Sequence, residues 1–112
     1  MDKIKKYKVI LSKDALEDIK DTKKYILDTF KYRQYAEDFS KKLQKAVRSL
    51  SVLAAGYKKT GFVIESMEVY YKPYSTYLIF FVIQDDTVII VRILKDRMYW
   101  QSIINRINNI NK

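Results

Sequence analysis

The chain has 112 residues, with neither cysteine nor histidine, and its 22 Lys and Arg against 13 Asp and Glu give a formal net charge of +9. The length suits one domain over residues 1–112, and 48% hydrophobic residues argue against disorder. Disulfides, thiolate metal sites and histidine chemistry are excluded, so we expect no metal and no cofactor. The positive charge favours a polyanionic partner such as RNA, DNA or the ribosome, or an acidic protein.

No stretch of the chain reaches the roughly 18 consecutive apolar residues that a membrane-spanning helix needs. The first residues, MDKIKKYKV, are charged and lack the apolar segment of a signal peptide. We therefore expect a soluble, cytoplasmic protein without a membrane partner. A lysine- and asparagine-rich composition that keeps the surface soluble is an alternative explanation of the basic charge.

The N-terminal half is predicted to contain one strand and two helices. Residues 6–12, KYKVILS, are rich in β-forming residues and predict a strand. Ser12 is a favourable N-cap for a helix over residues 14–30, which has an acidic first turn and apolar residues at helical spacing. A second apolar pattern predicts a helix over residues 36–53 that ends at Gly56. The short connection between the two helices requires an antiparallel hairpin.

The C-terminal half is predicted to be mostly strand. Residues 57–66, YKKTGFVIES, are expected to form a basic loop containing Gly61. Three strands follow, separated by turns at Pro73 with Ser75 and at QDD, and such short connections make an antiparallel meander. The strand sequences are MEVYYKP (67–73), TYLIFFVI (76–83) and TVIIVRIL (87–94). The last segment predicts a short helix with Trp100, Ile103, Ile104 and Ile107 on one face.

We therefore predict an α+β fold with an N-terminal strand, an antiparallel helix hairpin, a three-stranded antiparallel meander and a short C-terminal helix. Alternation places Leu78, Phe80 and Val82 opposite Tyr77, Ile79, Phe81 and Ile83. In the last strand it places Ile89, Val91 and Ile93 opposite Val88, Ile90, Arg92 and Leu94. Because both faces are apolar, we expect the hairpin to cover one and the C-terminal helix to cover part of the other.

Arg92 is the one charged residue inside the last predicted strand. A buried guanidinium is costly unless it is paired or reaches water. One interpretation is a structural ion pair with Glu65, Glu68 or Asp96. The other is that Arg92 projects into an open concavity beside the cations that follow the strand.

The stretch VYYKPYSTY, residues 69–77, interleaves four tyrosines with Lys72. Aromatic side chains beside cations are used for nucleic-acid stacking. Aromatic residues are equally typical of cross-strand packing in antiparallel sheets, and on this cluster alone packing is the better explanation.

Two stretches of the chain resemble the RelE/ParE toxins of bacterial type II toxin–antitoxin modules. They are KVILSKDALEDIKDTKKYI (8–26) and YLIFFVIQDDTVIIVRILKDRMYW (77–100), and the resemblance extends over about residues 6–104. It implies a cognate antitoxin as partner and one of two targets. RelE-like members cut mRNA in the ribosomal A site, whereas ParE-like members inhibit DNA gyrase and cleave nothing.

The first hypothesis is a ribosome-dependent mRNA endonuclease that inhibits translation. In such an enzyme the 2′-OH attacks the adjacent phosphate, and cations stabilise the charge that develops. The resemblance implies the following roles: Arg97 or Lys95 would stabilise the transition state, Tyr99 would act as base or orienting group, Arg92 would clamp phosphate, and Lys58, Lys59 and Lys72 would hold the RNA backbone.

The alternative is a non-catalytic, ParE-like inhibitor of DNA gyrase. The pattern RIL…R…W resembles that branch, and Lys95 occupies the position where many relatives carry histidine. Arg97 and Trp100 would then contribute to a protein interface, where both residue types are common hot spots. A degenerate or purely structural member of the family is a third reading.

Overall fold

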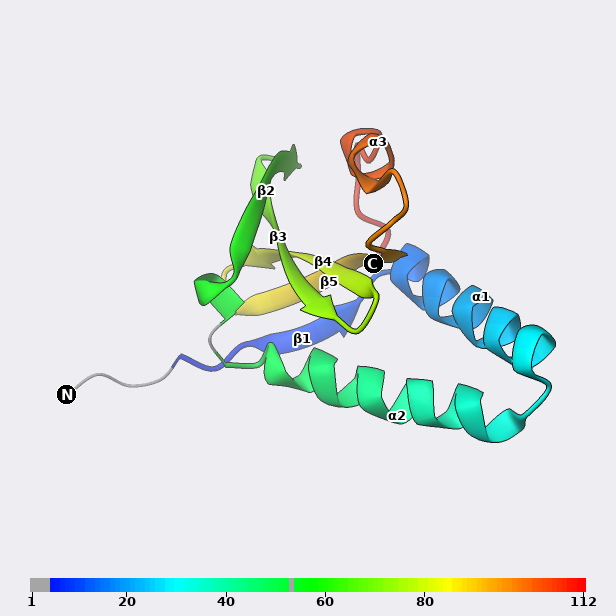
Figure 1. Ribbon diagram of the computed structural model, residues 1–112. Helices are drawn as coiled ribbons and strands as arrows, with labels where there is room; N and C mark the ends of the chain where they lie inside the picture. The colour runs from blue at the N-terminus through cyan, green and yellow to red at the C-terminus, as the bar shows by residue number, and fades with distance from the viewer. Residues whose placement is uncertain (1–4, 53) are drawn as a thin grey trace.

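The computed structural model describes residues 5–52 and 54–112 (Figure 1). Its elements in chain order are β1 (Lys8–Leu11), α1 (Lys13–Phe30), α2 (Arg33–Ser49), the 3-10 turn η1 (Ala54–Gly56), β2 (Lys58–Ile64), β3 (Met67–Tyr74), β4 (Tyr77–Gln84), β5 (Thr87–Lys95) and α3 (Trp100–Asn105). The predicted α+β fold class is confirmed. Within the described ranges no helix is long and apolar enough to cross a membrane.

The five strands form one sheet in the order β1-β5-β4-β3-β2. β2 to β5 pair antiparallel with their sequence neighbours, and β1 pairs parallel with β5. The connection between these two parallel strands contains the helix hairpin and the strands β2 to β4, and parallel strands need a long connection of this kind. Figure 1 shows α1 and α2 on the β1 side of the sheet, and α3 packs on the opposite face.

The loop predicted over residues 57–66 is wrong, because most of it forms the edge strand β2. Its register with β3 shifts between Lys59 and Val63, and Gly61 lies inside this irregularity with a φ of 90°. A glycine adopts that backbone angle without steric cost, so the bulge is local and pairing resumes beyond it. The bulge also interrupts the alternation of side chains, which is why the sequence pattern does not indicate a strand.

The second helix is shorter at its C-terminal end than the predicted 36–53. It ends at Ser49, and Gly56 instead closes the separate 3-10 turn. Beyond the helix the chain pairs with the residue before β1, because the Tyr7 N–H donates to the Ser51 carbonyl at 2.7 Å. Leu53, the last residue of the predicted helix, lies outside the described residues.

Apolar side chains cover both faces of the sheet, as expected. On one face, residues of β4 and β5 pack against Ala15, Ile26, Phe39, Leu43 and Leu50 of the hairpin segment. On the other, Ile64, Val69 and Ile104 join Phe80, Val82, Ile89 and Val91. Trp100 packs on this second cluster, with its ring centroid 5.1 Å from that of Phe80 and 6.2 Å from that of Phe62.

The predicted faces of β5 are correct up to Val91 and wrong beyond it. Phe81 pairs with Ile90 but Phe80 pairs with Arg92, so β5 contains one extra residue at Val91. This bulge inverts the alternation. Ile93 therefore packs on the hairpin face and Leu94 on the α3 face, the reverse of the sequence expectation.

The start of α1 supplies hydrogen bonds to β5 at the bulge, beyond the end of β1. Ser12 is buried; its Oγ accepts the Ala15 N–H at 3.1 Å as the predicted N-cap, and also donates to the Val91 carbonyl at 3.1 Å. Ser12 N–H donates to the Ile90 carbonyl at 2.9 Å. One hydroxyl thus serves both the helix terminus and the irregular strand.

Replacing Ser12 with alanine should lower the free energy of unfolding by about 1–2 kcal/mol, because the helix cap and the Val91 carbonyl each lose a buried partner. Urea denaturation measures this change. Ser49→Ala is the matched control: its hydroxyl is exposed and only bonds back to the Ala46 carbonyl, so a change within about 0.5 kcal/mol is expected. Equal midpoints for the two variants would contradict the double role of Ser12.

Candidate functional site

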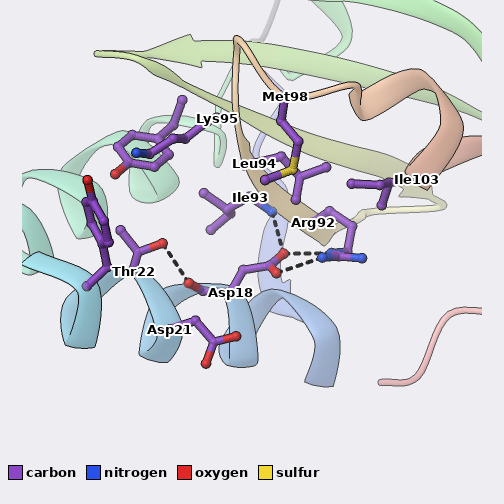
Figure 2. Close-up of a pocket in the computed structure, with 11 residues that line it drawn as sticks. Asp18, Asp21, Thr22, Arg92, Ile93, Leu94, Lys95, Met98 and Ile103 are labelled. Atoms are coloured by element: carbon purple, nitrogen blue, oxygen red, sulfur yellow. Dashed lines mark hydrogen bonds and ion pairs between the residues drawn. The ribbon is translucent and has the colours of Figure 1, made fainter.

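An open groove of about 450 Å³ lies where α1 faces the end of β5 and the turn that leads to α3 (Figure 2). Its walls combine carboxylates, cations and exposed apolar side chains. Asp18, Asp21, Thr22 and Tyr25 come from α1, Tyr77 from β4, Arg92, Ile93, Leu94 and Lys95 from β5, and Met98 and Ile103 from the segment that follows. The groove therefore depends on how α1 is held against β5.

An ion pair between Asp18 and Arg92 holds α1 against β5 (Figure 2). The guanidinium donates to both carboxylate oxygens, through Nε at 2.7 Å and Nη2 at 2.8 Å, while the Ile93 N–H donates to Oδ2 at 2.9 Å. The side chains are 25% (Arg92) and 12% (Asp18) exposed. The hydrogen bonds that the guanidinium donates to Asp18 raise the pKa of Arg92, so it remains charged.

The predicted structural partners of Arg92 are wrong. Glu68 binds Lys59, and Glu65 accepts the backbone N–H of Ile110. The expectation that Arg92 faces an open concavity is met in part, because it lines the groove together with Lys95. Its charge is nevertheless neutralised, so the arginine acts first as a structural residue.

Asp18 is a site residue that was missed from the sequence, where the acidic residues at the start of this helix are considered only as a favourable first turn. The position of Asp18 in the sequence could have indicated its role. It lies three residues after the buried Ala15 and eight before the buried Ile26, on the side of α1 that faces the core. A carboxylate on an apolar stripe requires a buried partner. Arg92, which lies within a core strand, is the candidate for that partner.

Among the described residues, no side-chain hydrogen bond or cation–π pair joins the three residues predicted to be catalytic. Lys95 lies over the ring of Tyr25, with Nζ 4.5 Å from the centroid. Tyr99 is 77% exposed and Arg97 is exposed. Within residues 5–52 and 54–112, neither Arg97 nor Tyr99 makes a side-chain hydrogen bond or an ion pair. No partner in the described chain orients the Tyr99 hydroxyl as a base.

The three lysines predicted to bind RNA are divided between the two faces of the sheet. Lys59 pairs across the ladder with Tyr70, on the hairpin face, and binds Glu68 at 2.7 Å. That hydrogen bond raises the pKa of Lys59. Lys72, two residues after Tyr70, shares the hairpin face. Lys58 pairs with Tyr71, which packs on the opposite cluster.

The described groove residues offer groups for contact with a partner, without a cluster of metal ligands. Nowhere in the part of the chain that the structure describes do three Asp or Glu side chains gather in a way that could hold a metal ion. What the groove rim does present is exposed apolar surface beside charge: Tyr25 is 52% and Met98 44% exposed. Exposed aromatic and methionine side chains next to arginine are typical of protein interfaces.

Comparisons with known proteins agree with the fold and the partner class. The family described as ParE toxin of type II toxin–antitoxin system, parDE, matches residues 9–100. Among solved structures, a chromosomal ParDE toxin–antitoxin system from P. aeruginosa is similar, with a TM-score of 0.65 and 11% identity over 80% of this chain and 95% of that chain. No curated protein matches the sequence significantly.

The sheet flanked by a helix hairpin and a C-terminal helix is thus a fold similar to that of the ParDE structure. Because the family match spans most of the sequence, this chain belongs to the ParE toxin family of type II toxin–antitoxin systems. Its partner class is accordingly a cognate antitoxin.

Asp18→Asn should lower the free energy of unfolding by about 2–3 kcal/mol, because it leaves the Arg92 charge without its carboxylate in a half-buried site. Asp21→Asn, one turn away on the same groove wall, is the matched control because Asp21 is exposed; a change within about 0.5 kcal/mol is expected. Chemical denaturation of both variants tests the difference. A similar effect of the two substitutions would refute a structural role of the Asp18–Arg92 pair.

Proposed function

We propose that this chain is a ParE-type toxin that inhibits DNA gyrase through a non-catalytic protein contact. This is the alternative of the sequence analysis rather than its first hypothesis of an mRNA endonuclease. Family membership favours it, because the ParE branch, unlike the RelE branch, is the one that implies gyrase inhibition. The composition adds support, since a chain without histidine lacks the commonest general acid–base group.

The placement of the predicted catalytic residues argues against RNA cleavage. General acid–base chemistry needs a base within hydrogen-bond reach of the proton it removes, held by a partner that orients it. Tyr99 is mostly exposed at the N-terminal end of α3. Arg92, the proposed phosphate clamp, is already bound bidentately by Asp18. These two arrangements weaken the endonuclease hypothesis.

The observation that carries the proposal is the exposed turn between β5 and α3. Arg97, Met98 and Tyr99 stand in consecutive positions, and Met98 and Tyr99 are 44% and 77% exposed. Aromatic, methionine and arginine side chains are enriched at protein interfaces, and tyrosine and arginine are frequent among the residues that dominate binding energy. Trp100, which the sequence analysis considered as an interface residue, instead fixes this turn to the core through its contacts with Phe62 and Phe80.

Inhibition of gyrase supercoiling by the purified protein tests the proposal. Arg97→Ala should weaken inhibition by about 10- to 30-fold, as expected for loss of a central interface arginine. Tyr99→Phe keeps the ring and should change inhibition by less than about threefold, whereas Tyr99→Ala should resemble Arg97→Ala. Circular dichroism of each variant checks that the fold is retained.

The opposite pattern identifies a nuclease. If Tyr99→Phe abolishes toxicity, and 5′-end mapping of cellular mRNA finds discrete cuts in translated regions that disappear in the Arg97→Ala variant, the gyrase proposal is rejected. Intact mRNA together with arrested growth supports it.

A further inference from the structure

The sheet carries tyrosines and lysines on the part of its hairpin face that the helices leave open. We call Tyr57, Lys59, Tyr70 and Lys72 the tyrosine–lysine face. Tyr57 and Tyr70 pack at the margin of the hairpin-side core, and Lys59 and Lys72 share their side of the sheet through the β2–β3 register. β2 projects away from the hairpin in Figure 1. All four side chains are half-buried or exposed.

Lys72 is a half-buried cation, and among the described residues no carboxylate lies within ion-pair distance of it. Its Nζ donates to the Tyr57 hydroxyl at 2.8 Å and lies 4.8 Å from the ring centroid. Because the Tyr57 oxygen accepts this hydrogen bond, the phenol hydrogen remains available to a further acceptor. Lys72 and Tyr57 together form a pair of donors that suits an anionic oxygen.

The tyrosine rings themselves are already occupied. Tyr70 stacks on Phe81, with centroids 5.3 Å apart and an interplanar angle of 11°, and the Lys59 ammonium lies 5.7 Å from the Tyr70 centroid. Tyr57 packs edge-on against Phe81 and carries Lys72 over its ring. Base stacking needs a free ring face. The groups that remain are ammonium and hydroxyl donors, which contact phosphates rather than bases.

From these contacts we infer that the tyrosine–lysine face binds the phosphate backbone of duplex DNA without base specificity. The net charge of +9 supplies long-range attraction to such a polyanion. The choice of DNA rests on the proposed function, because duplex DNA is the substrate of gyrase. DNA contact through this face would add to the protein contact made by the β5–α3 turn.

Glu68 sets the strength of this contact. Its carboxylate binds Lys59 at 2.7 Å, and both side chains are more than half exposed. A phosphate approaching Lys59 must compete with that carboxylate. Removing the Glu68 charge while keeping its shape should therefore strengthen DNA binding, which is an effect that a damaged fold cannot produce.

The test is fluorescence anisotropy of a labelled DNA duplex with the purified full-length chain, without gyrase, between about 50 and 200 mM salt. Two phosphate contacts predict a salt slope of about −2, or about a tenfold loss of affinity over that range. Lys72→Met keeps the apolar stem and should make the slope shallower by about one. Glu68→Gln should tighten binding by at least about twofold.

Lys45→Met is the matched control, because it removes the same charge from an exposed position on α2 and should leave the slope unchanged. Absent or salt-independent DNA binding would overturn the inference, as would equal effects of Lys72→Met and Lys45→Met, or tighter binding to single-stranded RNA than to the duplex. Gyrase inhibition by the wild type is assayed separately. Because that assay does not depend on the DNA-binding results, failure of the DNA-binding inference can be distinguished from failure of the proposed function.

Discussion

The contact between Asp18 and the β5 bulge determines how the two halves of this toxin fit together. One carboxylate binds the Arg92 guanidinium and the Ile93 N–H, and Ser12 bonds to β5 from the N-cap of the same helix. These bonds satisfy polar groups on the edge of β5 beyond the end of β1. They also fix α1 against the strand whose C-terminal end carries the candidate site. Taking the two charges partly out of water offsets much of the gain from pairing them, so this contact specifies the geometry more than it adds net stability. Removing one partner is still costly, because it leaves the other charge unpaired.

The bulge has a functional consequence, because it decides which side chains meet at the groove. By inverting the alternation, it places Ile93 on the hairpin face, and it leaves Lys95 facing Tyr25 of α1. The exposed Arg97, Met98 and Tyr99 then follow, held by Trp100 in the opposite core cluster. The proposed gyrase contact lies on the turn after β5, whereas Lys59, Tyr70 and Lys72 of the tyrosine–lysine face lie on β2 and β3, so each can be altered without the other.

Most of the fold could be predicted from the sequence, because element type follows local pattern. Ser12 as a cap, the hairpin, the strands β3 to β5 and α3 all carry clear signals. β2 and the end of β5 could not be predicted, since bulges at Gly61 and Val91 break the period of two on which strand patterns depend. The partner of Arg92 was missed for a related reason: Asp18 lies 74 residues away, and no local rule connects them.

The most direct test of this account is native-state hydrogen exchange of the Ile93 amide, followed by NMR. This N–H lies away from β4 and has the Asp18 carboxylate as its acceptor, so it should exchange as slowly as the neighbouring core amides of β5. In an Asp18→Ala variant it should exchange much faster, while Ile90, which pairs with β1, changes little. Fast exchange of Ile93 in the wild type, or equal acceleration of both amides, would show that Asp18 does not hold the bulge.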